Sequence, residues 1–216
     1  MLFRSLKHHA TISFSSVDRK EESNQLTVGI CHYPIAYRNE IITKDTALDD
    51  GKCTQDELDR FALRRGRIIL TKDSESRDDI GIPAYVAEDI PNAVCGYHLA
   101  FVDVMDELIV PEFLFRFLQA DKVMGYYAAN SYGVTRYGLG KPVIENLLVA
   151  IPPVEEQRAI VAHIRQSTMT IDKVKVEVNR VLEQLSVYRQ SIISEAVTGK
   201  IDLREWEPAT QQVIRS

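Results

Sequence analysis

Three stretches of the chain combine hydrogen-bonding side chains with cations and aromatic rings. They are His32-Tyr-Pro-Ile-Ala-Tyr-Arg-Asn39, Leu70-Thr-Lys-Asp-Ser-Glu-Ser-Arg77 and Gly133-Val-Thr-Arg-Tyr-Gly-Leu-Gly-Lys141. Guanidinium, hydroxyl and amide groups bind phosphates and the edges of bases, and such groups recur in all three stretches. The stretches therefore favour contact with nucleic acid, although each is also compatible with an ordinary surface loop.

The motifs that would indicate catalysis are incomplete. A Walker A phosphate loop needs Lys directly after its second Gly and then Ser or Thr, but Leu139 follows Gly138 here, and Pro142 follows Lys141. The Pro-Pro pair after Ile151 is similar to the core of amino-methyltransferase loops, yet no polar residue precedes it and no aromatic residue follows it. No two histidines have HxxxH or HExxH spacing. We therefore predict that the chain is not an enzyme and binds no cofactor or metal ion of its own.

One catalytic alternative remains open. Four carboxylates, those of Asp73, Glu75, Asp78 and Asp79, cluster in one short segment. A nuclease could use such groups to hold magnesium. The spacing defines no particular geometry, however, so a solvated acidic loop is the favoured interpretation.

The composition describes a soluble chain with an acidic balance. Its 216 residues include 26 Lys and Arg against 31 Asp and Glu, a net charge of −5. Since nucleic-acid binders are usually basic, a DNA-binding surface here must be a local patch or must share phosphate contacts with a partner. The three cysteines, Cys31, Cys53 and Cys95, are an odd number and far apart, so we expect reduced thiols in a cytoplasmic protein. No apolar run is long enough for a membrane helix, and we expect no membrane partner.

Residues 1–150 are predicted to form one mixed α+β domain. Short apolar runs bounded by turn residues indicate strands, and two segments with capping residues indicate helices. The expected strands are Leu26–Ile30, Arg67–Leu70, Ala84–Ala87 and Leu147–Ile151, and the expected helices are Thr54–Arg65 and Val110–Gly125.

Residues 151–200 are predicted to form one long coiled-coil helix, and residues 201–216 a polar tail. No Gly or Pro interrupts 154–198. Apolar residues recur there in alternating steps of three and four, which is the seam of a heptad repeat. The seam consists of Ile171, Val174, Val178, Val181, Leu185, Tyr188 and Ile192. Such a stripe needs a partner helix, from a second copy or another protein. Packing of the helix on its own domain is the alternative.

Several of these residues lie in motifs by which the chain resembles a known family, the specificity (S) subunits of type I restriction–modification systems. The resemblance rests on Ile12-Ser-Phe-Ser-Ser-Val-Asp-Arg-Lys20, Leu26-Thr-Val-Gly-Ile-Cys-His-Tyr33, Tyr37-Arg-Asn39, Gly66-Arg-Ile-Ile-Leu-Thr-Lys-Asp-Ser74, Ile82-Pro-Ala-Tyr-Val86, Tyr97-His-Leu99 and Gly133-Val-Thr-Arg-Tyr-Gly-Leu139. Its most specific part is Ile151-Pro-Pro-Val-Glu-Glu-Gln157, followed by the heptad helix and by Glu195-Ala-Val-Thr-Gly-Lys-Ile-Asp202.

The resemblance implies a non-catalytic reader of double-stranded DNA. In this family, a target-recognition domain reads one half of a split site, and long spacer helices pair antiparallel to set the distance between the halves. These helices also help to dock modification subunits, which carry S-adenosylmethionine and methylate adenine N6. Restriction subunits can join the complex and cleave unmodified DNA.

The chain departs from the family in having one recognition domain and one spacer helix, where the usual S subunit has two of each. It is either a natural half-subunit or a fragment of a longer chain. For a half-subunit, we predict a homodimer through the heptad seam, which would read a palindromic split site because two-fold symmetry repeats the half-site.

Loop chemistry and family position together select ten candidate DNA contacts. They are Tyr33, Tyr37, Arg38, Lys72, Ser74, Arg77, Thr135, Arg136, Tyr137 and Lys141. The bases that they would read do not follow from the sequence. Besides the nuclease, a coiled-coil adaptor without any nucleic-acid role remains as an alternative.

Overall fold

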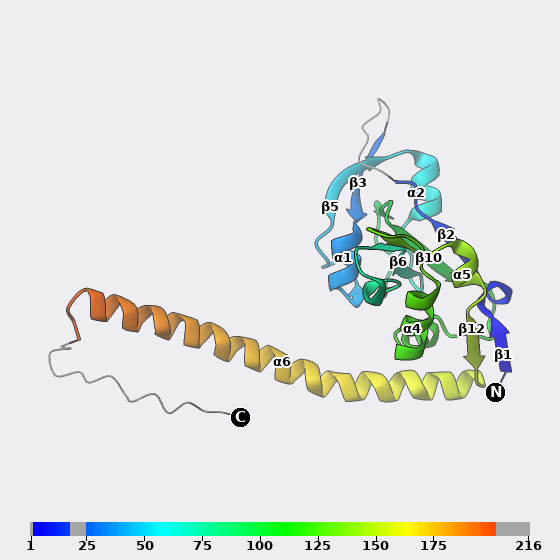
Figure 1. The fold of residues 1–216 in the computed structure, drawn as a ribbon. Coiled ribbons are helices and arrows are strands. Elements are labelled where there is room, and N and C mark those ends of the chain that lie inside the picture. Colours follow the sequence, from blue (N-terminus) through cyan, green and yellow to red (C-terminus); the bar gives the residue numbers. More distant parts are fainter. Residues whose placement is uncertain (1, 18–24, 202–216) are drawn as a thin grey trace. The chain divides into compact units, whose positions relative to one another are not determined.

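The computed structural model describes residues 2–17 and 25–201 (Figure 1). The chain divides into two compact units, Met1–His163 and Ile164–Ser216. Three sequence predictions fall partly outside the described residues. These are the end of the first resemblance motif, at 18–20, the last residue of the motif that ends at Asp202, and all but the first residue of the predicted tail, at 202–216.

Strands in the described part of the first unit form two main sheets and two short ladders. The five-stranded sheet has the order β2 (Ala10–Phe14), β10 (Leu99–Val104), β6 (Ile68–Thr71), β8 (Pro83–Val86), β4 (Ile41–Ile42), and the second sheet has the order β5 (Asp49–Cys53), β3 (Leu26–Cys31), β9 (Ala93–Cys95). Two further ladders pair β1 (Leu2–Ser5) with β12 (Leu148–Ile151) and β7 (Asp73–Ser74) with β11 (Tyr137–Gly138). The β4–β8 and β3–β9 pairs are parallel and the other pairs antiparallel, which confirms the predicted mixed α+β class.

The shorter helices of the first unit lie between and beside these strands (Figure 1). They are α1 (Tyr33–Arg38), α2 (Gln55–Phe61), α3 (Pro111–Leu118), α4 (Asp121–Asn130) and α5 (Lys141–Glu145), with 3₁₀ turns η1 (Leu6–His8) and η2 (Arg77–Asp79). All four expected strands are present, as β3, β6, β8 and β12, with ends shifted by one residue.

The burial of β6 on both faces explains why its sequence is continuously apolar. All four of its residues are buried. Side chains alternate across a strand, so Ile68 and Leu70 join one core cluster, together with Phe115 and Tyr127 of the helices. Ile69 joins the other cluster, which includes Phe61 of α2. The sheet is thus covered on both faces, a situation that removes the polar alternation from a strand.

Helix α2 begins as predicted and ends earlier. Thr54 forms a capping box, because its hydroxyl accepts from the Glu57 N–H while the Glu57 carboxylate accepts from the Thr54 N–H. We expected this helix to continue to Arg65, but it ends at Phe61. Tertiary pairing overrides helix propensity there, since Ala62 bridges to Val94 and the Leu63 N–H donates to the Ala93 carbonyl.

The helix predicted over Val110–Gly125 is two helices. Pro111 occupies the first turn of α3 as expected, but α3 ends at Leu118. The backbone of Ala120 is extended, and α4 then continues through Gly125 to Asn130. The bend allows the ring of Tyr127 to pack on Gly81, where a Cβ atom would lie 2.3 Å from that ring.

The long helix α6 runs from Val154 to Val197, close to the predicted limits. Gly199, two residues after its end, has the left-handed φ of +71°. The Lys200 N–H donates to the Glu195 carbonyl, 2.9 Å away, which is typical of a glycine-terminated helix. Among the described residues, no helix has the length and apolar character needed to cross a membrane.

Candidate nucleic-acid interface

The second and third polar stretches of the sequence meet in the ladder between β7 and β11. Ser74 pairs with Tyr137, and Asp73 pairs with Gly138. The ladder continues where the Leu139 N–H donates to the Lys72 carbonyl at 2.8 Å. The loop that carries Arg136 is therefore fixed beside the strand that carries Ser74.

The first stretch contributes two aromatic rings from α1. Pro34 occupies the first turn of this short helix, where a missing N–H costs nothing. Tyr33 and Tyr37 are four residues apart and so lie on one face of the helix. Their rings are stacked, with centroids 5.7 Å apart and an angle of 13° between the planes.

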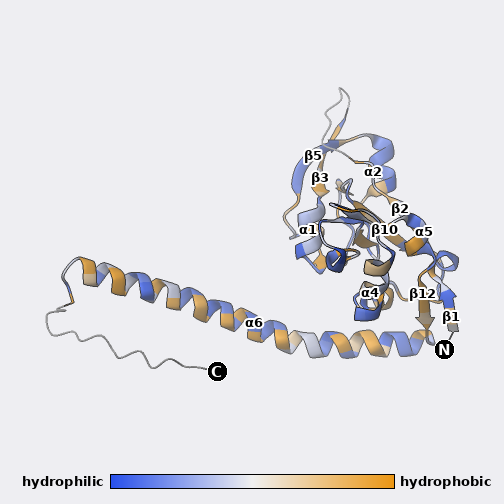
Figure 2. Cartoon of the chain, in the orientation of Figure 1, coloured by the Kyte–Doolittle hydropathy of each residue, from blue (hydrophilic) through white to orange (hydrophobic). Residues whose placement is uncertain are grey.

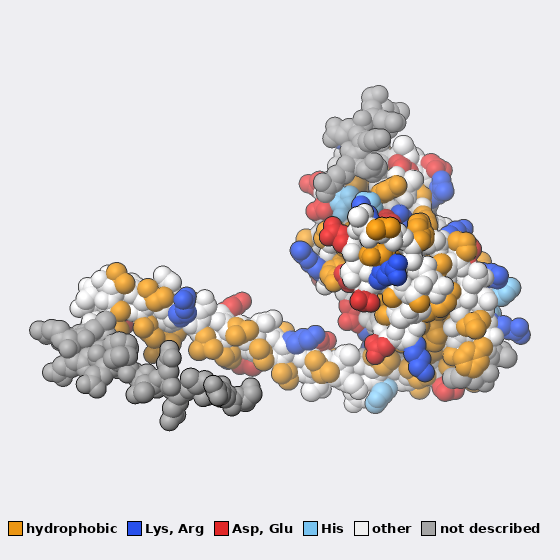
Figure 3. Space-filling view, in the orientation of Figure 1, with side chains coloured by type: hydrophobic (Ala, Val, Ile, Leu, Met, Phe, Trp, Pro, Cys, Tyr) orange, Lys and Arg blue, Asp and Glu red, His pale blue; other side chains and the backbone are white. Residues whose placement is uncertain are grey.

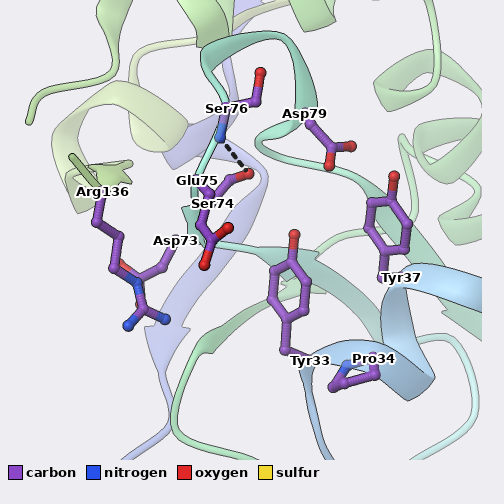
Figure 4. A pocket seen from close by; sticks show the side chains of 9 residues that line it. All are labelled: Tyr33, Pro34, Tyr37, Asp73, Ser74, Glu75, Ser76, Asp79 and Arg136. Atoms are coloured by element: carbon purple, nitrogen blue, oxygen red, sulfur yellow. Dashed lines mark hydrogen bonds between the residues drawn. The ribbon is translucent and has the colours of Figure 1, made fainter. Parts of the chain in front are cut away.

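These segments surround a cleft of about 460 Å³. Figure 4 shows the hydroxyl groups of Tyr33 and Tyr37 pointing toward the loop that carries Ser76 and Asp79. The cleft is lined by Tyr33, Pro34, Tyr37, Asp73, Ser74, Glu75, Ser76, Asp79 and Arg136. Four of the ten candidate DNA contacts, Tyr33, Tyr37, Ser74 and Arg136, thus meet at one place although they are distant in the sequence.

The two tyrosines of the cleft stay protonated at neutral pH. A hydrogen bond to Asp79, together with the charge of that carboxylate, raises the pKa of Tyr37. Burial raises the pKa of Tyr33, and a hydrogen bond with Ser74 offsets part of this effect. Neutral phenols can donate and accept hydrogen bonds, so this wall of the cleft can bind base edges as well as phosphates.

A charge network borders the cleft around Asp73. One carboxylate oxygen, Oδ2, lies 2.9 Å from Lys72 Nζ and 3.0 Å from His98 Nδ1. Burial raises the pKa of Asp73, but the hydrogen bonds from Lys72 and His98 and their charges outweigh burial and hold the pKa below its usual value. Arg136 Nη2 lies 3.2 Å from the same His98 nitrogen. Lys72 also lies over the ring of Tyr97, 4.9 Å from its centroid.

His98 and Tyr97 were not among the candidate contacts. The Tyr97 ring meets the His98 ring edge-on at 5.0 Å, and its side chain is exposed. The only signal in the sequence was the position of the pair before an apolar strand, in a motif already used for the resemblance.

The remaining candidates lie outside the cleft lining. The Arg77 guanidinium lies 4.9 Å from the ring centroid of Tyr137, and Thr135 is exposed at the loop tip. Arg38 borders a smaller cleft together with Glu40 and Gln119, among others. Lys141 begins α5, where its ammonium group is 3.6 Å from a carboxylate oxygen of Glu145.

The acidic segment does not form a metal site in the described part of the chain. Asp79 is hydrogen-bonded to Tyr37, and Asp73 pairs with Lys72 and His98. Among the described residues, no group of three or more His, Cys, Asp or Glu side chains could hold a metal ion. The face of the first unit seen in Figure 3 mixes acidic and basic side chains and shows no uniformly basic patch.

The seam residues of α6 are all exposed. Each of the seven seam residues, from Ile171 to Ile192, has an exposed fraction between 41% and 65%. Figure 2 shows hydrophobic residues recurring along α6 between hydrophilic ones. The second unit therefore presents an apolar stripe to solvent in the single chain, and pairing of this stripe remains a prediction.

No family model matches the chain. It is 28% identical over 155 residues to the type I restriction enzyme EcoBI specificity subunit of Escherichia coli, a match covering 72% of the chain and 31% of that protein. It is 24% identical over 169 residues to the EcoKI specificity subunit of Escherichia coli strain K12, covering 76% of the chain and 35% of that protein. The chain spans about a third of the length of these curated relatives. These matches confirm the resemblance to S subunits.

Solved structures share the fold. A chain from a study of assembly and conformational transition of the type I R-M system has a TM-score of 0.61 at 16% identity, covering 90% of this chain and 45% of that one. The HsdS subunit of Thermoanaerobacter tengcongensis has a TM-score of 0.57 at 15% identity, covering 93% and 45%. The S subunit of M. genitalium has a TM-score of 0.55 at 14% identity, covering 90% and 46%.

Proposed function

We propose that this chain, a sequence relative of the specificity subunits of type I restriction enzymes, recognises DNA sequence for such an enzyme and carries out no chemistry itself. It reads one half of a split site and docks modification subunits, whose S-adenosylmethionine methylates adenine N6. Restriction subunits can join the same complex, which acts in the cytoplasm. The relatives are named as specificity subunits, which agrees with the prediction that the chain is not an enzyme.

The observation that carries the proposal is the meeting of Tyr33, Ser74 and Arg136 at one cleft. Three segments that were selected for their loop chemistry could have dispersed over the surface. Instead, α1 and the β7–β11 ladder bring four of the ten candidates together. The cleft offers guanidinium and phenol donors together with hydroxyl and carboxylate acceptors, which is the mixture that reads base edges.

Charge favours base edges over phosphates as the ligand of this cleft. Asp73, Glu75 and Asp79 line it together with a single cation, that of Arg136. Carboxylates repel phosphates but can accept a hydrogen bond from the amino group of a base. Most phosphate contacts would then come from the modification subunits, which makes a net charge of −5 tolerable in a DNA reader.

The proposal includes a homodimer formed by α6. Seven apolar residues at heptad spacing are exposed in the single chain, and the burial of such a stripe drives helix pairing. A two-fold dimer would hold two copies of the cleft and read a palindromic split site. If the chain is instead part of a longer protein, a second spacer helix of that protein would occupy the seam.

The test is to map methylated adenines in cells that carry this chain with its modification subunits. We expect methylation only within one split motif, and none when the chain is deleted. Methylation at the same sites without the chain would contradict the proposal. The coiled-coil adaptor predicts that the complex binds DNA equally with and without the chain, and the nuclease predicts magnesium-dependent cleavage by the chain alone.

A further inference from the structure

One nitrogen of His98 faces two groups that make opposite demands on it. His98 Nδ1 lies 3.0 Å from Asp73 Oδ2, an oxygen that can only accept a hydrogen bond when ionised. The same Nδ1 lies 3.2 Å from Arg136 Nη2, which can only donate. A single imidazole nitrogen either carries a proton or offers a lone pair, so Nδ1 cannot serve both neighbours at once. Arg136 Nη2 also lies 3.5 Å from His98 Nε2, however, so the second ring nitrogen can accept from Arg136 while Nδ1 donates to Asp73.

The protonation state of His98 therefore decides whether the ring can hold Arg136. In neutral His98 with its proton on Nδ1, Nδ1 donates to Asp73, and Nε2 accepts from Arg136 and holds that guanidinium at the cleft. In the imidazolium form both nitrogens carry protons, so Nδ1 donates to Asp73 and Arg136 loses its acceptor. The positive ring also repels the guanidinium, which pushes Arg136 away from the position it holds beside the cleft.

The surroundings of His98 keep an ionised carboxylate beside its Nδ1. Asp73 accepts a hydrogen bond from Lys72 as well, and its lowered pKa keeps it ionised throughout the neutral range. The charged groups that face His98 are thus Asp73 of β7, Lys72 through the shared carboxylate, and Arg136 from the loop before β11. The ring of Tyr97 packs edge-on against His98 from its own segment.

We infer that His98 is a positioning residue for sequence reading, which orients Arg136 toward a base when neutral and releases it to bind phosphate without sequence preference when protonated. The inference rests on the proposed function. Protonation adds one positive charge beside the DNA, so non-specific binding should strengthen and its salt dependence should steepen by about one counterion. The ratio of cognate to non-cognate affinity should fall, because a freed guanidinium no longer favours one base.

The experiment uses the complex of this chain with its modification subunits. Dissociation constants are measured for a cognate duplex and a scrambled duplex at about pH 6 and about pH 8, the range over which histidine changes its charge. For the unsubstituted chain we expect the affinity ratio to fall by about tenfold at the lower pH, as expected when one side-chain contact to a base is lost. A thermal melt at each pH separates these effects from unfolding.

Two variants and a control make the result specific to His98. The His98→Asn amide oxygen can accept from Arg136 at either pH and does not titrate, so this variant should keep the high ratio and lose its pH dependence. The His98→Ala variant should show the low ratio at both pH values. The His163→Asn control changes an exposed histidine of α6 and should respond to pH like the unsubstituted chain.

A pH response that survives in His98→Asn would overturn the inference, and so would a high ratio in His98→Ala at about pH 8. In both cases the complex still prefers cognate DNA, so the proposed function stands. A complex that prefers no sequence at any pH contradicts the proposed function and the inference together.

Discussion

Tyr137 pairs with Ser74 across the β7–β11 ladder, and the Arg77 guanidinium covers the Tyr137 ring at 4.9 Å. This pairing joins two stretches that are far apart in the chain and places Arg136 directly beside the paired residue. An arginine on a free loop would lose much conformational entropy on binding DNA. Attachment to a ladder reduces that loss, so the position of Arg136 should matter more than that of other exposed arginines.

The first prediction is that Arg136→Ala weakens cognate DNA binding by the assembled complex by about 10- to 100-fold, since a good contact to a base contributes about 1–3 kcal/mol. Binding to a scrambled duplex should weaken much less. The control is Arg60→Ala, which removes an exposed arginine paired with Asp56 on α2. Both are measured by fluorescence anisotropy with labelled duplexes, and cognate binding that is unchanged in Arg136→Ala would count against the assigned cleft.

The second prediction concerns the backbone of the loop that presents Arg136. Gly133 has a φ of +127°, and a Cβ atom there would lie 1.9 Å from the Arg136 carbonyl oxygen. Gly133→Ala must therefore distort the loop and should weaken cognate binding about as much as Arg136→Ala does. The loop is exposed, so the melting temperature should change little.

Gly125→Ala is the matched control for this substitution. Gly125 lies within α4 and a Cβ atom there would meet nothing within 4 Å. Alanine is favoured over glycine inside a helix by up to about 1 kcal/mol, so this variant should bind DNA normally and melt at a slightly higher temperature. If Gly133→Ala binds as well as Gly125→Ala, the loop does not present a contact.

The sequence was sufficient for features that depend on local pattern. The heptad steps and the terminal Gly199 located α6 to within three residues at each end, and the capping residue Thr54 located the start of α2. Apolar runs located four strands. Family resemblance added the type of domain, which composition alone, with its acidic balance, would have argued against.

Features that depend on tertiary pairing were missed. Helix α2 ends at Phe61 because the next residues pair with β9, and the helical pattern of the sequence does not predict that pairing. The β7–β11 ladder has two residues per strand, too few for an alternating pattern. His98 enters the site through contacts with residues that are distant in sequence, so its role could only be inferred from the structure.

The third prediction is that Gln157→Leu destabilises the first unit. The Gln157 side chain is fully buried, and its oxygen accepts from the Val110 N–H at 2.8 Å. Its nitrogen donates to the carbonyls of Leu108 and Pro152 at 2.7 and 2.8 Å. Leucine would leave these three backbone groups without the partners they have here, at a cost of roughly 3 kcal/mol in the free energy of unfolding.

Urea denaturation of the full chain measures this cost. The control is Gln166→Leu, which makes the same chemical change at an exposed position of α6 outside the heptad seam. It should leave the free energy of unfolding unchanged within about 0.5 kcal/mol. Equal stability of the two variants would show that the three hydrogen bonds of Gln157 do not hold the start of α6 in the first unit.

The fourth prediction addresses the homodimer. Val178 occupies a seam position of α6, whereas Val176, two residues earlier, lies on another face of the helix, and both are exposed in the single chain. Val178→Asp would place two buried carboxylates in a dimer interface, which is strongly unfavourable. Val176→Asp makes the same change outside the seam and should have little effect.

Size-exclusion chromatography with light scattering should give about twice 24.5 kDa for the unsubstituted chain and for Val176→Asp, and 24.5 kDa for Val178→Asp. A monomer of the unsubstituted chain at high concentration would refute the dimer, and equal masses for the two variants would refute the seam.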